Sequence, residues 1–524
     1  MKLKKILPIL LLFLSMFIIT GCDFNEVIDQ IFPAGTATKL ANVTSSTSTT
    51  SRTTKKGATT ISEAPITKVI TGDNTNISSV KLVSINDTHG QLVTDGYLMG
   101  LSQVEGTTKY LEEQDNQHYI RIMCGDLFQG SYVSRQTYGY CLIDALNAAN
   151  YDCMVLGNHE FDWGLDVIEA YWDGDESNGE ANFPLLCANL IDKRTGLRPD
   201  WVKPYMIINY YGISVGIIGA IGETLESTIA TEYISDYEFT EELPIVKEYA
   251  AELKNKGCDV IIYASHSYVS ETYELIANSI TSSCPVDAFL AGHSHDSIEE
   301  YYKRSYDSYM IPLIQSYTKS RNFGTISINL NSDKKATSAT FNHYLQNSSV
   351  VQNSSNDDAV ETAVSKYMSI VNEGNEVLGL ISRYRNGKQE VGDLLIQAMM
   401  KLTGANVGMA NTGGIRVSSI STGNITFAEV YEAFPFDNKV VYFYMTGRKL
   451  KEYMNQRTGV VYNSDFDSSS IVDSEVYKFV TIDYCANYRN KDILKYTTDG
   501  KWYSTDEFEY NVVAEYIRKN SPIN

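Results

Sequence analysis

Five short polar clusters hold the residue types that bind divalent metal ions. Five of the seven histidines of the chain lie in them. Asp, Asn and His supply oxygen and imidazole ligands that suit Mn, Fe, Co, Ni or Zn, and no thiolate belongs to the set. The clusters are Asn86-Asp87-Thr88-His89-Gly90, Gly125-Asp126-Leu127-Phe128-Gln129-Gly130, Gly157-Asn158-His159-Glu160-Phe161-Asp162, Ser265-His266-Ser267 and Gly292-His293-Ser294-His295.

A short apolar run with the length of a buried strand precedes each cluster. Stretches with helical periodicity lie between these runs, at 100–114, 138–149 and 243–256. This alternation predicts an α/β layered domain. Because neighbouring strands of an open α/β sheet end at one crevice, we expect the five clusters to converge there. The expected strands are 80–85, 119–123, 153–156, 184–187, 214–218, 260–264 and 288–290.

The rest of the chain predicts a second domain. The pattern at 310–330 indicates a hairpin, and 357–371 indicates a single helix that connects two domains. A second mixed α/β segment follows at 378–524. The length of 524 residues agrees with two globular domains.

The N-terminal residues resemble a bacterial lipoprotein signal. Lys2, Lys4 and Lys5 precede an apolar run at 6–19, which is shorter than the roughly 18 residues of a spanning helix. A small residue, Gly21, then stands directly before Cys22, so we expect residues 1–21 to be removed and Cys22 to carry lipid. An uncleaved anchor or a plain secretory signal are the alternatives. Residues 22–78 are expected to form a Ser/Thr-rich tether to an extracytoplasmic membrane surface.

The charge balance excludes one class of partner. Lys and Arg number 43 against 64 Asp and Glu, which gives a net charge of −21. So acidic a surface repels the phosphates of nucleic-acid polymers. The oligomeric state stays open.

The motifs NDTHG, GDxxxG, GNHEFD, SHS and GHSH, in this order, resemble those of the calcineurin-like metallophosphoesterases. The longer forms NDTHGQL and GNHEFDWG are similar to those of the secreted 5′-nucleotidase family. The resemblance is strong over 79–330 and weaker over 378–490. It implies a metallophosphoesterase α/β sandwich at 79–345, a linker and connector helix at 346–377, and a smaller mixed α/β substrate-binding domain at 378–524.

The resemblance implies two divalent metal ions, of Mn, Zn, Co, Ni or Fe, that activate a water for attack on phosphorus. Asp126 would be shared between the two ions. The first ion would be held by Asp87, His89, Asp126 and His295, and the second by Asp126, Asn158, His266 and His293.

The resemblance also implies a catalytic dyad. His159 would stabilise charge on the phosphoryl group or its leaving oxygen, and Asp162 would orient the imidazole. A helix N-cap is the alternative role for Asp162.

In the C-terminal segment the resemblance implies a nucleotide site. Its members would be Asn411 and Arg416 in a substrate loop, Phe436 and Tyr484 as rings that stack on the base, and Arg385 as a second arginine. Packing in the core is the alternative for the two rings.

Two positions in the C-terminal segment depart from the family pattern. Tyr488-Arg489-Asn490 replaces a Gly-Gly-Asp run whose Asp binds the ribose. Gly387 stands where the family has its second substrate arginine, with Arg385 and Lys388 nearby.

The expected function is hydrolysis of the phosphate monoesters of extracellular nucleotides. Cleavage of 2′,3′-cyclic nucleotides, UDP-sugars or other phosphoesters is an alternative within enzymes. A non-catalytic surface lipoprotein that only binds ligands is the alternative of another class.

Overall fold

The computed structural model describes residues 66–72, 77–465, 467–487 and 493–524. They form two compact α/β units, each with its own hydrophobic core. Of the described residues, those within 66–129 and 137–367 belong to the N-terminal unit, and those within 130–136 and 368–524 belong to the C-terminal unit. The predicted signal at 1–21 and the lipid site Cys22 lie outside the described residues.

Two β-sheets pack face to face in the N-terminal unit, and their inner faces share one apolar core. One sheet has the order β1 (Ile66–Ile70), β7 (Tyr205–Tyr210), β8 (Ile213–Ile221), β10 (Val260–His266), β11 (Ala288–Gly292), β13 (Met310–Gln315) and β12 (Ile298–Lys303). The other has the order β15 (Ala336–Leu345), β14 (Asn322–Leu330), β2 (Ser79–Ile85), β3 (Ile120–Cys124), β4 (Cys153–Val155) and β5 (Leu185–Leu186).

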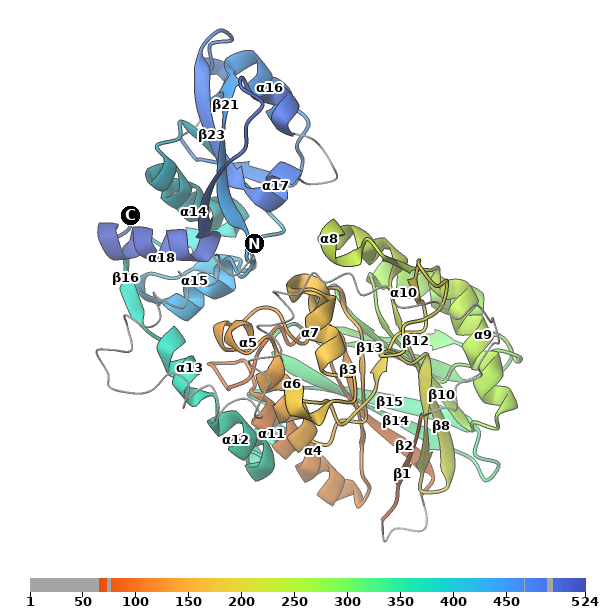
Figure 1. The fold of residues 1–524 in the computed structure, drawn as a ribbon. Coiled ribbons are helices and arrows are strands. Elements are labelled where there is room, and N and C mark those ends of the chain that lie inside the picture. Colours follow the sequence, from red (N-terminus) through yellow and green to blue (C-terminus); the bar gives the residue numbers. More distant parts are fainter. Residues whose placement is uncertain (1–65, 73–76, 466, 488–492) are drawn as a thin grey trace. The chain divides into compact units, whose positions relative to one another are not determined.

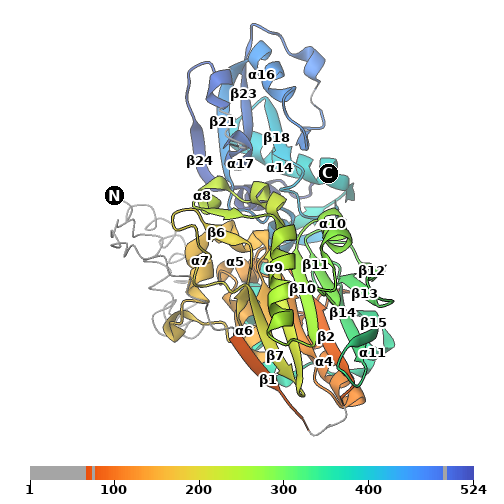
Figure 2. The same cartoon turned by 90° about the vertical axis from the view of Figure 1, so that its right-hand side faces the viewer.

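Helices cover the outer faces of this sandwich. Figures 1 and 2 show α9 and α10 outside the seven-stranded sheet, and α4 and α6 outside the six-stranded sheet. The helices of this unit are α4 (Leu101–Asp115), α6 (Tyr140–Ala148), α7 (Leu165–Ala170), α8 (Thr231–Ile234), α9 (Glu242–Asn255), α10 (Val269–Ser279), α11 (Ser349–Asn353) and α12 (Asp358–Ser365). A small sheet pairs β6 (Leu190–Asp192) with β9 (Tyr237–Phe239). The layered α/β architecture predicted from the strand and helix pattern is confirmed.

Two expectations at the edges of this unit are wrong. The tether was expected to extend to residue 78, yet Ile66–Ile70 form β1, which pairs in parallel with β7. The expected hairpin at 310–330 does not form, because β13 and β14 belong to different sheets. Their antiparallel partners are instead β12 and β15.

The expected single helix at 357–371 is two helices, α12 and α13 (Met368–Gly374). The break falls at Tyr367, where the N-terminal unit ends. The ring of Tyr367 is fully buried, and its hydroxyl donates to an Asp144 carboxylate oxygen at 3.0 Å.

A five-stranded sheet forms the centre of the C-terminal unit. Its order is β22 (Val460–Tyr462), β18 (Val407–Asn411), β23 (Val476–Ile482), β21 (Lys439–Thr446) and β24 (Tyr503–Phe508). Two short pairs join β16 (Val377–Ile381) with β20 (Gly423–Thr426) and β17 (Arg385–Asn386) with β19 (Ser419–Ile420). The remaining helices are α5 (Tyr132–Gln136), α14 (Gly387–Thr403), α15 (Phe427–Ala433), α16 (Gly447–Met454), α17 (Asp483–Asn487) and α18 (Glu509–Asn520).

Helix α5 belongs to the C-terminal unit although it lies between N-terminal segments in the sequence. Tyr132 donates to Glu373 at 2.9 Å, and Arg135 pairs with Asp437 at 2.6 Å. The chain therefore passes between the two units three times.

Among the described residues no helix is both long and apolar enough to cross a membrane. The seven cysteines of this part of the chain are free thiols.

Candidate metal centre

The predicted metal ligands lie at strand ends on loops that are hydrogen-bonded to each other. The backbone N–H of Asp87 donates to the Gly125 carbonyl at 3.0 Å, and that of His89 donates to the Asp126 carbonyl at 3.0 Å. These bonds continue the parallel pairing of β2 with β3 beyond the last residues of both strands. The first two clusters are thereby held side by side.

Five of the predicted ligands have an unusual backbone conformation. Asp87, His89, Asp126, His293 and His295 all have positive φ angles, between 46° and 79°. This left-handed region costs a non-glycine residue about 1–3 kcal/mol. In this conformation the loops turn several side chains toward one point.

The seven predicted ligands converge in two groups that share one carboxylate. Ligand atoms of Asp87, His89, Asp126 and His295 lie within 4.8 Å of one another, and so do those of Asp126, His266 and His293. The Asn158 Oδ1 atom lies 3.0 Å from His293 Nδ1, which places it at the second group. Asp126 belongs to both groups.

Hydrogen bonds to backbone carbonyls fix two of the imidazoles. His266 Nδ1 lies 2.8 Å from the Cys124 carbonyl, and His89 Nδ1 lies 2.8 Å from the Gln129 carbonyl. A carbonyl only accepts, so each Nδ1 carries a proton, and Nε2 is the ring atom left to face the cluster. This is the arrangement that orients metal-ligating histidines.

These two Nε2 atoms face other atoms that can bind a metal ion. His266 Nε2 lies 3.0 Å from Asp126 Oδ2, and both atoms are buried without a hydrogen-bond partner in the described structure. His89 Nε2 lies 3.0 Å from His295 Nε2. At this separation either a proton or a metal ion lies between the two atoms of each pair. The residues present therefore fit two divalent metal ions.

The pKa values show the same requirement for positive charge. Burial alone would raise the pKa of Asp87, yet a hydrogen bond with His295 and the charge of His266 bring it to about 2. Burial disfavours the imidazolium of His266, but the Asp126 carboxylate outweighs burial and raises the pKa of His266 to about 10. The carboxylates thus stay ionised and require a cation beside them, either a proton or a metal ion.

The predicted dyad is formed at the edge of this cluster. His159 Nδ1 lies 2.7 Å from Asp162 Oδ2, and the backbone N–H of His159 donates to Asp126 Oδ1 at 2.9 Å. Because Asp162 contacts Nδ1, the Nε2 atom of His159 is available for other contacts. The rings of His159 and His89 are 5.3 Å apart, so the dyad is adjacent to the first ligand group.

Glu160 has a positioning role that the sequence did not predict. Its fully buried carboxylate accepts N–H bonds from Asp126 at 2.9 Å, Leu127 at 2.7 Å and Gly157 at 2.8 Å. Burial and the Asp126 charge raise the pKa of Glu160 to about 7. Its place beside His159 in the third cluster was the available signal, but only the fold shows that it holds the Asp126 loop.

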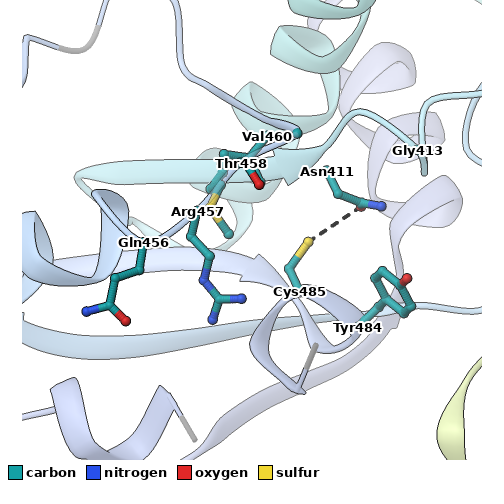
Figure 3. A pocket seen from close by; sticks show the side chains of 10 residues that line it. Asn411, Gly413, Gln456, Arg457, Thr458, Val460, Tyr484 and Cys485 are labelled. Atoms are coloured by element: carbon teal, nitrogen blue, oxygen red, sulfur yellow. Dashed lines mark hydrogen bonds between the residues drawn. The ribbon is translucent and has the colours of Figure 1, made fainter. Parts of the chain in front are cut away.

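In the C-terminal unit the structure brings four predicted substrate residues into two pairs. The Arg416 guanidinium lies 6.0 Å from the centre of the Phe436 ring. Asn411 and Tyr484 line a cavity of about 260 Å³, in which Cys485 Sγ bonds Asn411 Oδ1 (Figure 3). Gly414 permits this loop, because a Cβ there would lie 2.8 Å from Asn411 Oδ1.

Arg385 does not lie with these residues. Its side chain is fully buried and donates to the backbone carbonyls of Glu390 at 3.1 Å and Asn524 at 2.7 Å. Lys388 is the cation next to Arg416 instead, and its ammonium donates to the Ile415 carbonyl. Burial and the charge of Arg416 lower the pKa of Lys388. The departure at Tyr488-Arg489-Asn490 lies outside the described residues.

Comparisons with known families agree with both units. Residues 80–297 match the calcineurin-like phosphoesterase family, and residues 375–513 match the C-terminal domain of 5′-nucleotidases. The chain carries the two domains of a 5′-nucleotidase-like metallophosphoesterase. The two-domain α/β fold inferred from the five motifs is thus confirmed.

Individual relatives of this metallophosphoesterase are distant. The chain is 26% identical over 438 residues to the endonuclease YhcR of Bacillus subtilis, which covers 76% of the chain but only 35% of that protein. It is 26% identical over 455 residues to a 5′-nucleotidase of Vibrio cholerae, covering 72% of the chain and 78% of the relative. The 5′-nucleotidase precursor of Thermus thermophilus has a similar fold, with a TM-score of 0.70, 19% identity and coverage of 84% and 96% of the two chains.

Substitution of Glu160 tests its role in positioning the shared ligand. Glu160→Gln should weaken metal binding by roughly 10- to 100-fold, because an amide group would face the backbone N–H groups that hold Asp126. Mn²⁺ titration of the metal-free variant measures the change. Glu248→Gln, at an exposed position on α9, is the matched control. Unchanged Mn²⁺ affinity in Glu160→Gln would show that the Asp126 loop holds its conformation without this carboxylate.

Proposed function

We propose that the protein hydrolyses the 5′-phosphate monoesters of nucleotides outside the cytoplasm, in a reaction that depends on two divalent metal ions. The observation that carries this proposal is the convergence of seven Asp, Asn and His side chains in two groups that share Asp126. Such a donor set fits two divalent metal ions, and the family match supplies the phosphoester class of substrate.

The ligand groups support a division of roles. Asp126 would be shared by both ions, with Asp87, His89 and His295 at one and Asn158, His266 and His293 at the other. When bound, the ions would neutralise charge on the phosphoryl group and make a water molecule more acidic. His159, held by Asp162, would donate a hydrogen bond to the phosphoryl group or to the oxygen that leaves.

The C-terminal unit supports nucleotides as the substrate class. Arg416 and Lys388 provide two adjacent cations, and in the described residues neither forms an ion pair with a carboxylate. An anionic phosphate is a fitting partner for such a pair. Phe436 and Tyr484, both partly exposed, would stack on the base, and Asn411 would bind its polar edge.

An extracytoplasmic location belongs to this proposal. The signal-like residues 1–21 and Cys22 support export and a lipid anchor on the membrane. Phosphate removal there would yield an uncharged nucleoside.

Phosphate release from a panel of substrates tests the proposed function. With added Mn²⁺ the protein should release phosphate from nucleoside 5′-monophosphates, and chelation of the metal should abolish this release. Faster hydrolysis of 2′,3′-cyclic nucleotides, UDP-sugars or phosphoesters without a base would favour those substrates instead. Tight nucleotide binding without any turnover would favour a surface binding protein.

Substitution of His159 separates catalysis from metal binding. His159→Ala should lower kcat roughly 100-fold while bound metal stays at two ions per chain, because His159 is proposed to contact the phosphoryl group and no ion. Elemental analysis of the purified variant measures the metal. Fewer than two ions would make His159 a ligand and contradict the dyad. His118→Ala is the matched control, because His118 lies outside the clusters.

Substitution of Lys388 tests the second phosphate cation. Lys388→Gln should raise KM for a nucleoside monophosphate by about 10-fold with little change in kcat, because a charged hydrogen-bond donor is lost from binding. Steady-state kinetics of the unaltered protein and of Lys388→Gln measure both constants. Lys401→Gln, an exposed lysine of the same helix, should leave KM unchanged. An unchanged KM in Lys388→Gln would leave Arg416 as the phosphate cation without Lys388.

A further inference from the structure

A cavity in the C-terminal unit contains a cation that the proposed hydrolysis does not use. Two loops form its walls, 411–413 after β18 and 456–460 between α16 and β22. They are hydrogen-bonded to each other, since the N–H and the hydroxyl of Thr412 both donate to the Gly459 carbonyl, at 2.8 and 3.0 Å. Met409, Tyr484 and Cys485 complete the lining.

Arg457 is the charged side chain of this lining. Its Nε atom is buried without a hydrogen-bond partner, and no described carboxylate forms an ion pair with its guanidinium. One face of the guanidinium packs 4.3 Å from the centre of the Tyr453 ring. In Figure 3 the side chain extends from its loop alongside Cys485. Arg457 thus has no carboxylate partner among the described residues, although the chain has 64 acidic residues against 43 basic ones.

The chemistry of the lining favours an anionic group. A guanidinium presents its N–H groups in a planar fork that matches phosphate oxygens. Gln456 and Thr458 add an amide and a hydroxyl, and no carboxylate lines the cavity among the described residues. The volume of about 260 Å³ is at the small end for ligand pockets, so the cavity suits one part of a larger molecule.

The cavity shares residues with the proposed nucleotide site but has its own cation. Asn411 and Tyr484 belong to both, whereas Arg416, Lys388 and Phe436 do not line the cavity. A nucleotide that stacks on Tyr484 would therefore lie against the cavity that Arg457 lines, and a second anionic group on that nucleotide would bind there.

We propose that Arg457 binds a second phosphate on the ribose of a nucleotide, so that nucleoside 3′,5′-bisphosphates are preferred substrates. This inference rests on the proposed function. In the reaction, the bond between the 5′ oxygen and phosphorus breaks, a bond from the water oxygen to phosphorus forms, and the leaving oxygen takes a proton. The products are inorganic phosphate and a nucleoside 3′-phosphate, in which the second phosphate is retained.

Binding measurements in chelator, where no turnover occurs, test Arg457 separately from catalysis. By calorimetric titration the protein should bind adenosine 3′,5′-bisphosphate at least roughly 10-fold more tightly than adenosine 5′-monophosphate. Arg457→Gln should abolish this preference, and Arg457→Lys, which keeps the charge but not the planar fork, should retain part of it. Arg448→Gln, an exposed arginine of α16, should keep the full preference.

Three results would overturn the inference. The first is equal affinity of the unaltered protein for the two ligands. The second is a bisphosphate preference that survives in Arg457→Gln. The third is a loss of affinity in both Arg457 variants that is confined to guanosine 5′-monophosphate, titrated in the same way. The last result would assign Arg457 to a guanine edge, which also accepts two bonds from arginine. Hydrolysis of adenosine 5′-monophosphate with Mn²⁺ is measured in parallel. Turnover without a bisphosphate preference would overturn only this inference, whereas absence of both binding and turnover would overturn the proposed function as well.

Discussion

The charge of two buried carboxylates, Asp87 and Asp126, is the constraint on which the metal centre of the N-terminal unit depends. The backbone carbonyls of Cys124 and Gln129 accept hydrogen bonds from Nδ1–H of His266 and His89, which directs Nε2 of both rings into the cluster. These Nε2 atoms lie 3.0 Å from Asp126 Oδ2 and His295 Nε2. Buried carboxylates need positive charge beside them, which a proton or a metal ion supplies. The surrounding loops hold the ligands in this arrangement.

Several features of the chain serve that purpose. Glu160 ties the backbone of the Asp126 loop to the start of the next cluster. Glycines let the loops approach, because a Cβ on Gly125 would lie 2.5 Å from His266 Nδ1. The strands supply rigidity, since their residues form the continuous core between the two sheets. A site held on rigid elements with strained loops keeps its ligands in place before a metal ion arrives.

Much of this could be predicted from the sequence because the signals are local. Apolar runs followed by polar clusters predict strand ends, and the ends of β2, β3 and β10 lie within two residues of the prediction. The prediction of a hairpin at 310–330 was wrong because β14 pairs with β2, more than 230 residues earlier, and no local pattern encodes that partner. The prediction that Arg385 binds substrate was wrong for the same reason, since its guanidinium donates to the carbonyl of the distant Asn524. The role of Glu160, and the roles proposed for Lys388 and Arg457, depend on neighbours that only the fold supplies.

The central claim is that two cations flank Asp126. Anomalous diffraction from crystals of the protein grown with Mn²⁺ measures this directly. The account predicts two anomalous peaks about 3.5–4 Å apart with the Asp126 carboxylate between them. One peak bound by His89 and His295 and the other by His266 and His293 would complete the assignment. A single peak, or a peak at His159 with none at His266, would contradict it.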